Sequence, residues 1–470
     1  MSDDLVYASI GELASRIRSG EVSPVGLTEA VLTRIERLNP VLGAFITVTA
    51  DLAREQARRA EDEIRGDHYR GPLHGIPISL KDLYDTAGIP TTAGSRILAD
   101  RVPTTDATVT RRLSEAGAVL LGKTNLHEFA YGTTTLNPHF GHTRNPWDLE
   151  RITAGSSGGT AAAVAAGLGF MSMGSETGFS IRRPAAFCGV VGLKPTYGRV
   201  SRHGVLPCAW SLDHAGPLTR TVQDAALTLN AIAGYDAADP ASARRAVPDF
   251  TALLGKEIKG LRVGIPRHHF AGRIEPAVEA AFEQAIQVFR DLGAEPVELR
   301  LPRVRYALPA STTIMHVEVG AVHARWIRSR PEDYGADVRI RIQSGAAVTA
   351  EDYARAQRIR RWIADEVAEI WSRVDLLAAP TTPQVATRIA ESPEALRDPG
   401  FVVEEGLFNF LRLYALIGIP AISVPCGFSP EGLPIGLSLA GRPFDEPRVL
   451  QAAQAYEAAT EWSRRRPAIA

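Results

Sequence analysis

Short apolar segments with the composition of buried strands alternate along this chain with longer segments of helical periodicity. Residues 76–80 (Ile-Pro-Ile-Ser-Leu) and 118–121 (Ala-Val-Leu-Leu) are short and apolar, and a helix is expected between them over 109–116. Further strands are expected at 374–380 and 421–425. Strands that alternate with helices predict an α/β fold, in which one β-sheet is covered on both faces by α-helices.

The chain has 470 residues, which is long enough for several small domains or for one large α/β domain. No internal repeat or low-complexity linker divides the sequence, so we expect a single domain over residues 1–470. Helices are expected over about 5–65, where Ser9 and Glu12 have the spacing of a capping box. A second helical segment, rich in arginine, is expected over about 303–373 as a flank of the domain.

The charge and cysteine content exclude several classes of protein. Lys plus Arg number 52 and Asp plus Glu 53, a balance that does not support a nucleic-acid binder held by bulk electrostatics. Three cysteines without a CxxC pair indicate neither a disulfide scaffold nor a structural zinc site. The acidic start, residues 1–4, is not typical of a secretory signal, and no apolar stretch is long enough to span a bilayer. We therefore expect a cytoplasmic protein.

Two patterns suggest chemistry that their context does not support. Residues 117–124 match the P-loop pattern, but the residues between the two glycines are expected in a buried strand, which would use their amides in the sheet. His127, His139 and His142 lie close together without a matching carboxylate, so we expect no metal site. His214 is a possible partner for a catalytic serine, although no spacing requires it.

Two serine-containing segments and one lysine are the stronger candidates. Residues 154–159 (Ala-Gly-Ser-Ser-Gly-Gly) precede an alanine-rich helix, and they are either a functional hydroxyl loop or a flexible linker. Ser180 follows a turn and precedes an expected helix, so it is either an N-cap or a residue beside amides that face an oxyanion. Lys81 ends a strand-like segment. Burial would lower its pKa and make it a possible base, whereas exposure would make it a surface charge.

The order of these segments resembles the amidase signature family. A lysine follows a Gly-Ile-Pro strand, then comes the Gly-Ser-Ser-Gly-Gly loop, and a Thr-Gly-x-Ser turn places Ser180 24 positions after Ser156 (180 − 156). Residues 187–196 and 418–425 agree with the same family, and the resemblance extends to about Tyr456. It implies the amidase signature fold, a single large domain with a mixed β-sheet between layers of helices.

The resemblance also implies roles for individual residues. The family uses a Ser–cis-Ser–Lys triad, which maps here to Ser180 as nucleophile, Ser156 as bridging serine and Lys81 as base. Four backbone N–H groups are implied as the oxyanion hole, those of Thr177, Gly178, Phe179 and Ser180. Four residues are implied as the supporting loop, Gly155, Ser157, Gly158 and Gly159. The family chemistry implies neither a metal nor an organic cofactor.

Three positions near the expected nucleophile depart from the usual family pattern, namely Phe179, Ala154 and Glu176, the last of which replaces a usual aspartate. Phe179 stands where glycine normally precedes the nucleophile, and we expect it to form an aromatic wall of the acyl pocket. A positive φ there would strain a bulky residue by about 1–2 kcal/mol. Ala154 stands where glycine is common. Arg183 is either a ligand for a substrate carboxylate, as in some relatives, or an arginine with a structural role on the surface of a helix or in the interior.

The sequence therefore predicts an amidase that cleaves an aryl or alkyl amide, or a carbamate, through an acyl-enzyme. Three alternatives stay open: the glutaminase chain (the A chain) of a tRNA-dependent amidotransferase complex, a hydrolase of urethanes or esters, and a catalytically silent binding protein. We expect a small-molecule substrate as the partner, no nucleic acid, no membrane, and a monomer or homodimer.

Overall fold

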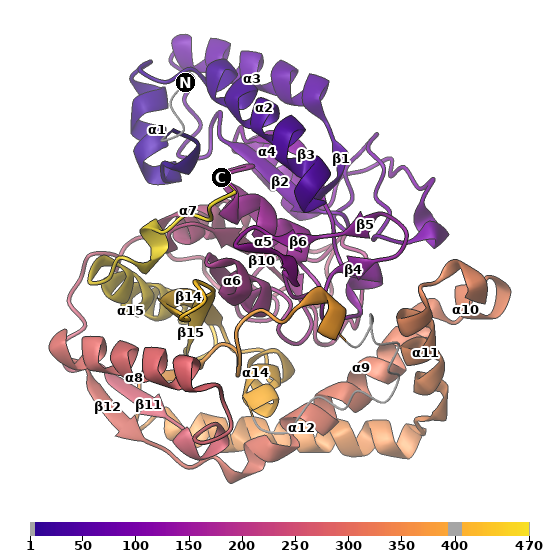
Figure 1. The fold of residues 1–470 in the computed structure, drawn as a ribbon, viewed down its shortest axis with the longest axis vertical. Helices are drawn as coiled ribbons and strands as arrows, with labels where there is room; N and C mark the ends of the chain where they lie inside the picture. The colour runs from indigo at the N-terminus through magenta and orange to yellow at the C-terminus, as the bar shows by residue number, and fades with distance from the viewer. Residues whose placement is uncertain (1–4, 393–406, 470) are drawn as a thin grey trace.

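The computed structural model describes residues 5–392 and 407–469, so the acidic start considered above lies outside the described residues. Within them, an eleven-stranded sheet crosses the molecule (Figure 1). In the order in which they pair, its strands are β1 (Phe45–Val48), β3 (Val119–Thr124), β2 (Pro77–Lys81), β8 (Met171–Glu176), β10 (His214–Thr219), β9 (Val191–Lys194), β14 (Ala421–Phe428), β15 (Pro434–Ala440), β13 (Leu376–Pro380), β11 (Arg262–Ile265) and β12 (Glu295–Glu298).

The sheet is mixed, and the direction of its strands decides where the site lies. Strand β2 runs parallel to both of its neighbours, β3 and β8, and β11 runs parallel to β13 and β12. The strands between these two groups pair antiparallel. Helices flank the sheet, so the prediction of one α/β domain with a mixed sheet is confirmed.

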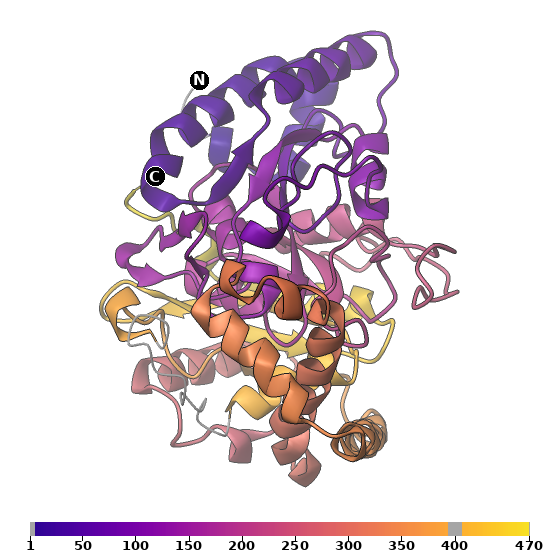
Figure 2. The same ribbon diagram turned by 90° about the vertical axis from the view of Figure 1, so that its right-hand side faces the viewer.

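Helices occupy both segments in which they were expected. The first segment holds α1 (Ile10–Arg18), α2 (Pro24–Leu42) and α3 (Ala50–Arg65), and the second holds α9 (Ala307–His323), α10 (Trp326–Ser329), α11 (Ala336–Ser344) and α12 (Ala350–Ile370). Figures 1 and 2 show α1–α3 at the upper end of the molecule and α9–α12 in its lower half. Ser9 caps α1 and Glu12 completes the capping box. The edge strand β1, which was not predicted from the sequence, lies between α2 and α3 in the first segment.

The remaining helices follow or precede the strands of the sheet. They are α4 (Thr108–Glu115), α5 (Gly158–Ala165), α6 (Arg182–Cys188), α7 (Val222–Ile232), α8 (Pro276–Asp291), α14 (Leu407–Leu416) and α15 (Glu446–Ala458). None of the helices in the described ranges has both the length and the apolar composition that a bilayer span needs. Residues 119–124 form β3 and pair with β1 and β2, which agrees with the rejection of a P-loop.

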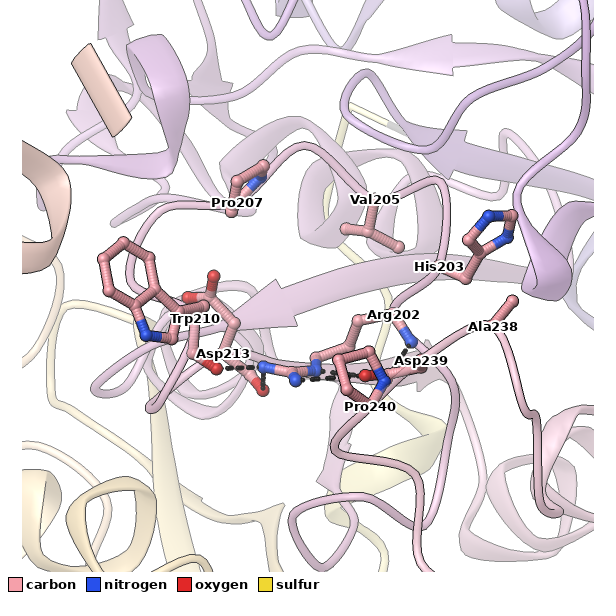
Figure 3. Close-up of a pocket in the computed structure, with 9 residues that line it drawn as sticks. All are labelled: Arg202, His203, Val205, Pro207, Trp210, Asp213, Ala238, Asp239 and Pro240. Atoms are coloured by element: carbon pink, nitrogen blue, oxygen red, sulfur yellow. Dashed lines mark hydrogen bonds and ion pairs between the residues drawn. The ribbon is translucent and has the colours of Figure 1, made fainter. Parts of the chain in front are cut away.

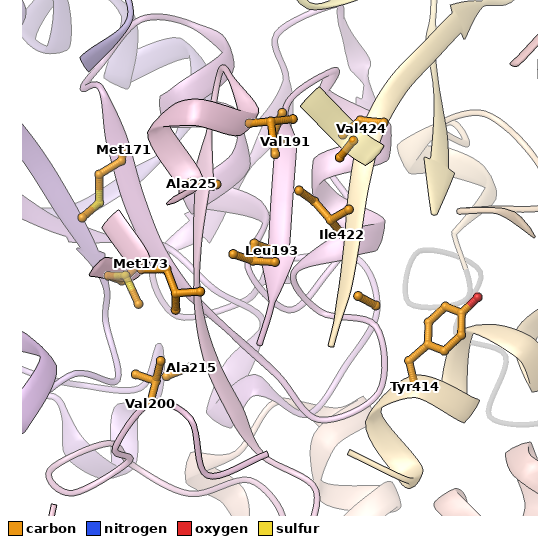
Figure 4. Packing of buried hydrophobic residues seen from close by; sticks show 14 of the residues in the cluster. Met171, Met173, Val191, Leu193, Val200, Ala215, Ala225, Tyr414, Ile422 and Val424 are labelled. Atoms are coloured by element: carbon orange, nitrogen blue, oxygen red, sulfur yellow. The ribbon is translucent and has the colours of Figure 1, made fainter. Parts of the chain in front are cut away.

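The core lies against the central strands (Figure 4). Met173 of β8, Leu193 of β9 and Ile422 of β14 are fully buried in one apolar cluster, and each comes from a strand close to the others in the sheet. This packing holds the ends of β8 and β9 rigidly, so side chains that follow these strands have defined positions.

Candidate active site

Lys81 and Ser175 meet because their strands are parallel neighbours. Lys81 is the last residue of β2, and Ser175 lies one residue before the end of β8. Parallel strands bring their carboxyl ends to the same edge of a sheet. The Lys81 Nζ atom lies 2.8 Å from Ser175 Oγ, a contact that was not predicted from the sequence. The sheet therefore places an amine and a hydroxyl together at this edge.

The serine–glycine loop supplies two more hydroxyls to the same amine. Lys81 Nζ lies 2.7 Å from Ser156 Oγ and 2.9 Å from Ser157 Oγ, directly before α5 begins. The peptide bond between Gly155 and Ser156 is cis. This segment is fully buried, so the alternative of a flexible linker does not describe it.

The surroundings of Lys81 favour its neutral form. The side chain is fully buried, and this burial lowers the pKa of Lys81 from 10.5 to about 7. Ser157 Oγ donates its proton to the Ser175 carbonyl at 3.1 Å, so Lys81 must act as donor toward Ser157. A neutral amine has two N–H donors and one lone pair. The lone pair of Lys81 is thus available to accept a proton from Ser156 or Ser175.

Ser180 lies in the turn between β8 and α6, close to the site but not joined to the amine. Within the described residues, its hydroxyl makes no hydrogen bond with Ser156 or Lys81. Hydrogen bonds of catalytic groups are often long before substrate binds. The structure thus connects Lys81 with Ser156 and leaves the last contact, to Ser180, open.

The turn that carries Ser180 presents backbone amides without protein acceptors. In the part of the chain that the structure describes, the N–H groups of Thr177, Gly178 and Ser180 have no hydrogen-bond acceptor. The next two amides, of Ile181 and Arg182, each donate to the Glu176 carboxylate at 3.1 Å. Glu176 therefore fixes the end of the turn, and the amides of Thr177, Gly178 and Ser180 stay available for a ligand.

The residue with a positive φ is Ala154 and not Phe179. The φ of Phe179 is not in the left-handed region, whereas Ala154 has a φ of 61°. Ala154 is the position where relatives commonly have glycine, and a left-handed alanine is strained by about 1–2 kcal/mol. Phenylalanine before Ser180 is consequently compatible with the turn, and the strain that a positive φ would cause there does not arise.

Arg182 and Arg183 are neighbours with different surroundings. Arg182 is fully buried, and its Nε and Nη2 atoms lie 2.8 and 2.5 Å from Glu176 Oε1. Arg183 donates to the Thr133 carbonyl at 3.1 Å, and its guanidinium lies 5.6 Å from the centroid of the Phe179 ring. Arg182 thus stabilises the turn, while Arg183 borders the aromatic ring of the residue before Ser180.

Asp213 supports the same turn from the opposite side. Its carboxylate accepts hydrogen bonds from Thr177 Oγ1 at 2.6 Å and from the Cys208 amide at 2.9 Å. Burial raises the pKa of Asp213 to about 6. Asp213 also lines a cavity of about 260 Å³ together with Arg202 and Trp210 (Figure 3). Asp213 was not predicted from the sequence, because no local motif marks a carboxylate that acts on a residue 36 positions away.

The histidines take structural positions. The His214 ring faces the Leu212 carbonyl, 2.6 Å from its Nδ1 atom, and makes no contact with a serine hydroxyl in the described residues. His127 contacts Asp337, and His139 contacts Glu128. The described ranges contain no group of three or more His, Cys, Asp or Glu side chains that could hold a metal ion.

Comparison with known proteins decides the family. The profile of the Amidase family matches residues 26–450. The chain belongs to the amidase signature family. Among its relatives, the A chain of glutamyl-tRNA(Gln) amidotransferase from Moorella thermoacetica is 44% identical over 99% of each chain. The crystal structure of the same amidotransferase chain from Thermotoga maritima is 36% identical, with a TM-score of 0.82 over 97% of this chain and 96% of that chain. A bacterial aryl acylamidase of the family is 29% identical, with a TM-score of 0.89 over 97% of each chain.

These comparisons correct one expectation about this member of the amidase signature family. A small-molecule substrate as sole partner, no nucleic acid, and a monomer or homodimer were expected. The full-length relatives are named as subunits, and their names include a tRNA, which overturns that expectation. The net charge of −1 was misleading because it is a sum over the whole surface, and a sum says nothing about a local interface.

The glycines of the supporting loop allow close contact with neighbouring backbone. A Cβ atom on Gly155 would lie 2.7 Å from the Thr134 nitrogen. A Cβ atom on Gly159 would lie 2.5 Å from the carbonyl oxygens of Ala44 and Asn125. Real Cβ atoms are essentially never that close to another heavy atom, so any side chain at these positions forces the backbone apart.

We expect Gly159→Ala to destabilise this amidase-family fold by about 2 kcal/mol, because two backbone segments must move to accept the methyl group. Gly320→Ala is the matched control, since its added Cβ meets no atom within 4 Å and α9 gains a better helix former. Thermal unfolding followed by circular dichroism measures both variants. Equal midpoints for the two variants would show that the loop tolerates a side chain.

Proposed function

We propose that this chain hydrolyses a carboxamide by acyl transfer to Ser180, as the catalytic component of an amidotransferase-type assembly. The observation that carries the hydrolysis is the buried Lys81 amine, which contacts three hydroxyls close to the turn where the amides of Thr177, Gly178 and Ser180 have no acceptor among the described residues. The identity of 44% over 99% of each chain to the A chain of an amidotransferase supports the assembly. Glutamine is then the amide that is cleaved, and ammonia is passed on within the assembly.

In the proposed mechanism, Ser180 Oγ attacks the carbonyl carbon of the amide. Its proton passes to Ser156 Oγ as the Ser156 proton passes to the lone pair of Lys81. The amides of the turn 177–180 donate to the developing oxyanion. The C–N bond then breaks as Lys81 returns a proton through Ser156 to the leaving nitrogen. Water hydrolyses the acyl-enzyme by the same relay and regenerates the Ser180 hydroxyl.

Residues around the relay hold it in place in this proposal. Ser157 and the glycines of the loop 155–159 orient Ser156, and Ser175 fixes the third side of the Lys81 amine. Phe179, which is almost fully buried, forms the aromatic wall of the acyl pocket. Arg183 positions this ring, because its guanidinium also lies 5.0 Å from the centroid of the Phe187 ring and donates to a backbone carbonyl.

A second candidate is a stand-alone amidase for aryl or alkyl amides. It is favoured by Phe179, which stands where glycine usually precedes the nucleophile and brings an aromatic ring beside the scissile bond. The likeness to a bacterial aryl acylamidase supports it as well. Carbamates and esters share the acyl chemistry, so they belong to the same test.

The two candidates differ in the amide that reacts fastest. We expect the purified chain to release ammonia from L-glutamine with a higher kcat/KM than that for aniline release from acetanilide. A phenyl carbamate and a phenyl ester serve as further substrates, and Ser180→Ala is the control. Faster cleavage of acetanilide would replace the first candidate by the second. If a fluorophosphonate failed to label Ser180, hydrolysis itself would be excluded.

A further inference from the structure

The guanidinium of Arg412, a residue of α14, packs against the turn that carries Ser180. A Cβ atom on Gly178 would lie 2.5 Å from Arg412 Nη1, so a side chain at position 178 would displace this guanidinium. The Arg412 guanidinium also lies 4.7 Å from the centroid of the Phe179 ring. The side chain is partly exposed, whereas its Nε atom is fully buried. A cation thus stands directly beside the unfilled amides of the turn.

This guanidinium lacks a counter-ion in the described part of the chain. Its Nε has no hydrogen-bond acceptor, and Nη1 reaches only the Met315 sulfur at 3.6 Å. Glu176 is within electrostatic range, but its oxygens are engaged by Arg182 and by two backbone amides. A charge taken out of water without a partner is unfavourable, and such a charge is typical of a binding site.

The neighbouring arginines lie beside carboxylates, whereas Arg412 pairs with no carboxylate among the described residues. Arg182 pairs with Glu176, and Arg341 lies 3.4 Å from Asp337. The hydroxyl of Tyr131 is buried, has no hydrogen-bond partner in the described residues, and is within electrostatic range of Arg412. A guanidinium without a counter-ion and a phenol hydroxyl without a partner, both judged among the described residues, therefore lie within electrostatic range of each other, and the guanidinium packs against the turn that carries Ser180.

The geometry points to a carboxylate-binding subsite, formed by Arg412 with Tyr131, for amide substrates that carry a carboxylate group. A guanidinium binds a carboxylate through two parallel N–H···O bonds, and a phenol hydroxyl donates a third. The inference deepens the proposed function, on which it rests, because it makes Arg412 the residue that selects an anionic amide over a neutral one. Arg183, which donates to a backbone carbonyl, is not needed for this selection.

A matched pair of substrates tests the subsite. Glutaramate and pentanamide have the same number of carbons and a primary amide, but only glutaramate carries a carboxylate. In Arg412→Gln, we expect kcat/KM for glutaramate to fall about 10- to 100-fold, the loss of a charged hydrogen-bonding partner, while that for pentanamide changes less than about threefold. Arg412→Lys keeps the positive charge but cannot form two parallel hydrogen bonds with a carboxylate, so we expect an intermediate loss of kcat/KM for glutaramate. Arg358→Gln removes an exposed positive charge on α12 and leaves both rates unchanged.

Binding without turnover separates this inference from the proposed function. In Ser180→Ala, glutarate binding measured by calorimetry should weaken about 10- to 100-fold when Arg412→Gln is added. If no amide is hydrolysed but glutarate still binds through Arg412, the proposed function fails and the subsite stands. Equal losses on glutaramate and pentanamide, glutarate affinity independent of Arg412, or a selective loss in Arg183→Gln instead would each overturn the inference.

Discussion

Lys81→Ala is expected to lower kcat for amide hydrolysis by at least about 10⁴-fold, the scale seen when one member of a catalytic unit is removed. Lys81 is the only group that contacts Ser156, Ser157 and Ser175 at once within the described residues. Without its lone pair, the proton of the nucleophile has no acceptor. Ser180→Ala should lose a similar factor, and the double variant should be no slower than either single variant.

A second buried lysine provides the control for this result. Lys194 is fully buried, and burial lowers its pKa to about 7 as well, but its amine faces the carbonyls of Pro195 and Ile419 instead of serine hydroxyls. Lys194→Met should therefore keep kcat within about tenfold per folded molecule. Comparable losses in the two lysine variants would remove the role assigned to Lys81.

The dependence of kcat/KM on pH tests the protonation state of the Lys81 amine. Because the pKa of Lys81 is lowered to about 7, the amine is protonated below this pH and neutral above it. A base must be neutral, so kcat/KM should rise with pH to a plateau above about pH 8 and fall about tenfold per unit below about pH 6. A rate that stayed constant between about pH 5.5 and 8.5 would contradict a lysine base.

Arg182→Met is expected to lower the free energy of unfolding by about 3–5 kcal/mol, because it leaves the Glu176 carboxylate buried without its cation. Arg182 also donates to the carbonyls of Gly178 at 3.1 Å and Leu411 at 2.8 Å, so its loss frees the turn from α14. Chemical denaturation measures the stability. Hydrolysis should fall in the same variant, since the amides of the turn lose their alignment.

An exposed ion pair is the matched control for Arg182. Arg361 lies 2.8 Å from Asp365 on α12, with 81% and 49% of their side-chain surfaces exposed. Water screens this pair, so Arg361→Met should change the free energy of unfolding by less than about 1 kcal/mol. The double variant Glu176→Gln with Arg182→Met should recover part of the loss, because no unpaired charge stays buried. If it recovered nothing, packing and not charge would explain the effect.

Local sequence was sufficient for the elements whose physics is local. The capping of α1 by Ser9 and Glu12 depends on residues three apart, and the apolar run of β2 depends on composition within five residues. The candidate residues Lys81, Ser156 and Ser180 were also recognisable, because each stands in a short motif whose order along the chain is specific.

Other parts of the site were not visible in the sequence. Ser175 and Asp213 belong to no motif, and Arg412 lies far along the chain from Ser180, on a helix that only the folded protein brings to the turn. Arg182 and Arg183 are adjacent, chemically identical and both buried, and only their contacts in the folded protein distinguish the one that pairs with Glu176 from the one that borders Phe179.

The sequence by itself determined the alternation of strands and helices, which depends on neighbours within a few residues, and it identified the candidate side chains through the order of their motifs along the chain. The tertiary structure decided the protonation and partners of those side chains. The pKa of Lys81 follows from its burial beside parallel strands and a serine loop. The lack of a counter-ion for Arg412 among the described residues follows from a carboxylate that Arg182 already engages. The environments of Lys81 and Arg412 both depend on contacts between segments that are far apart in the sequence. The order of the strands in the sheet determines which of these segments lie side by side.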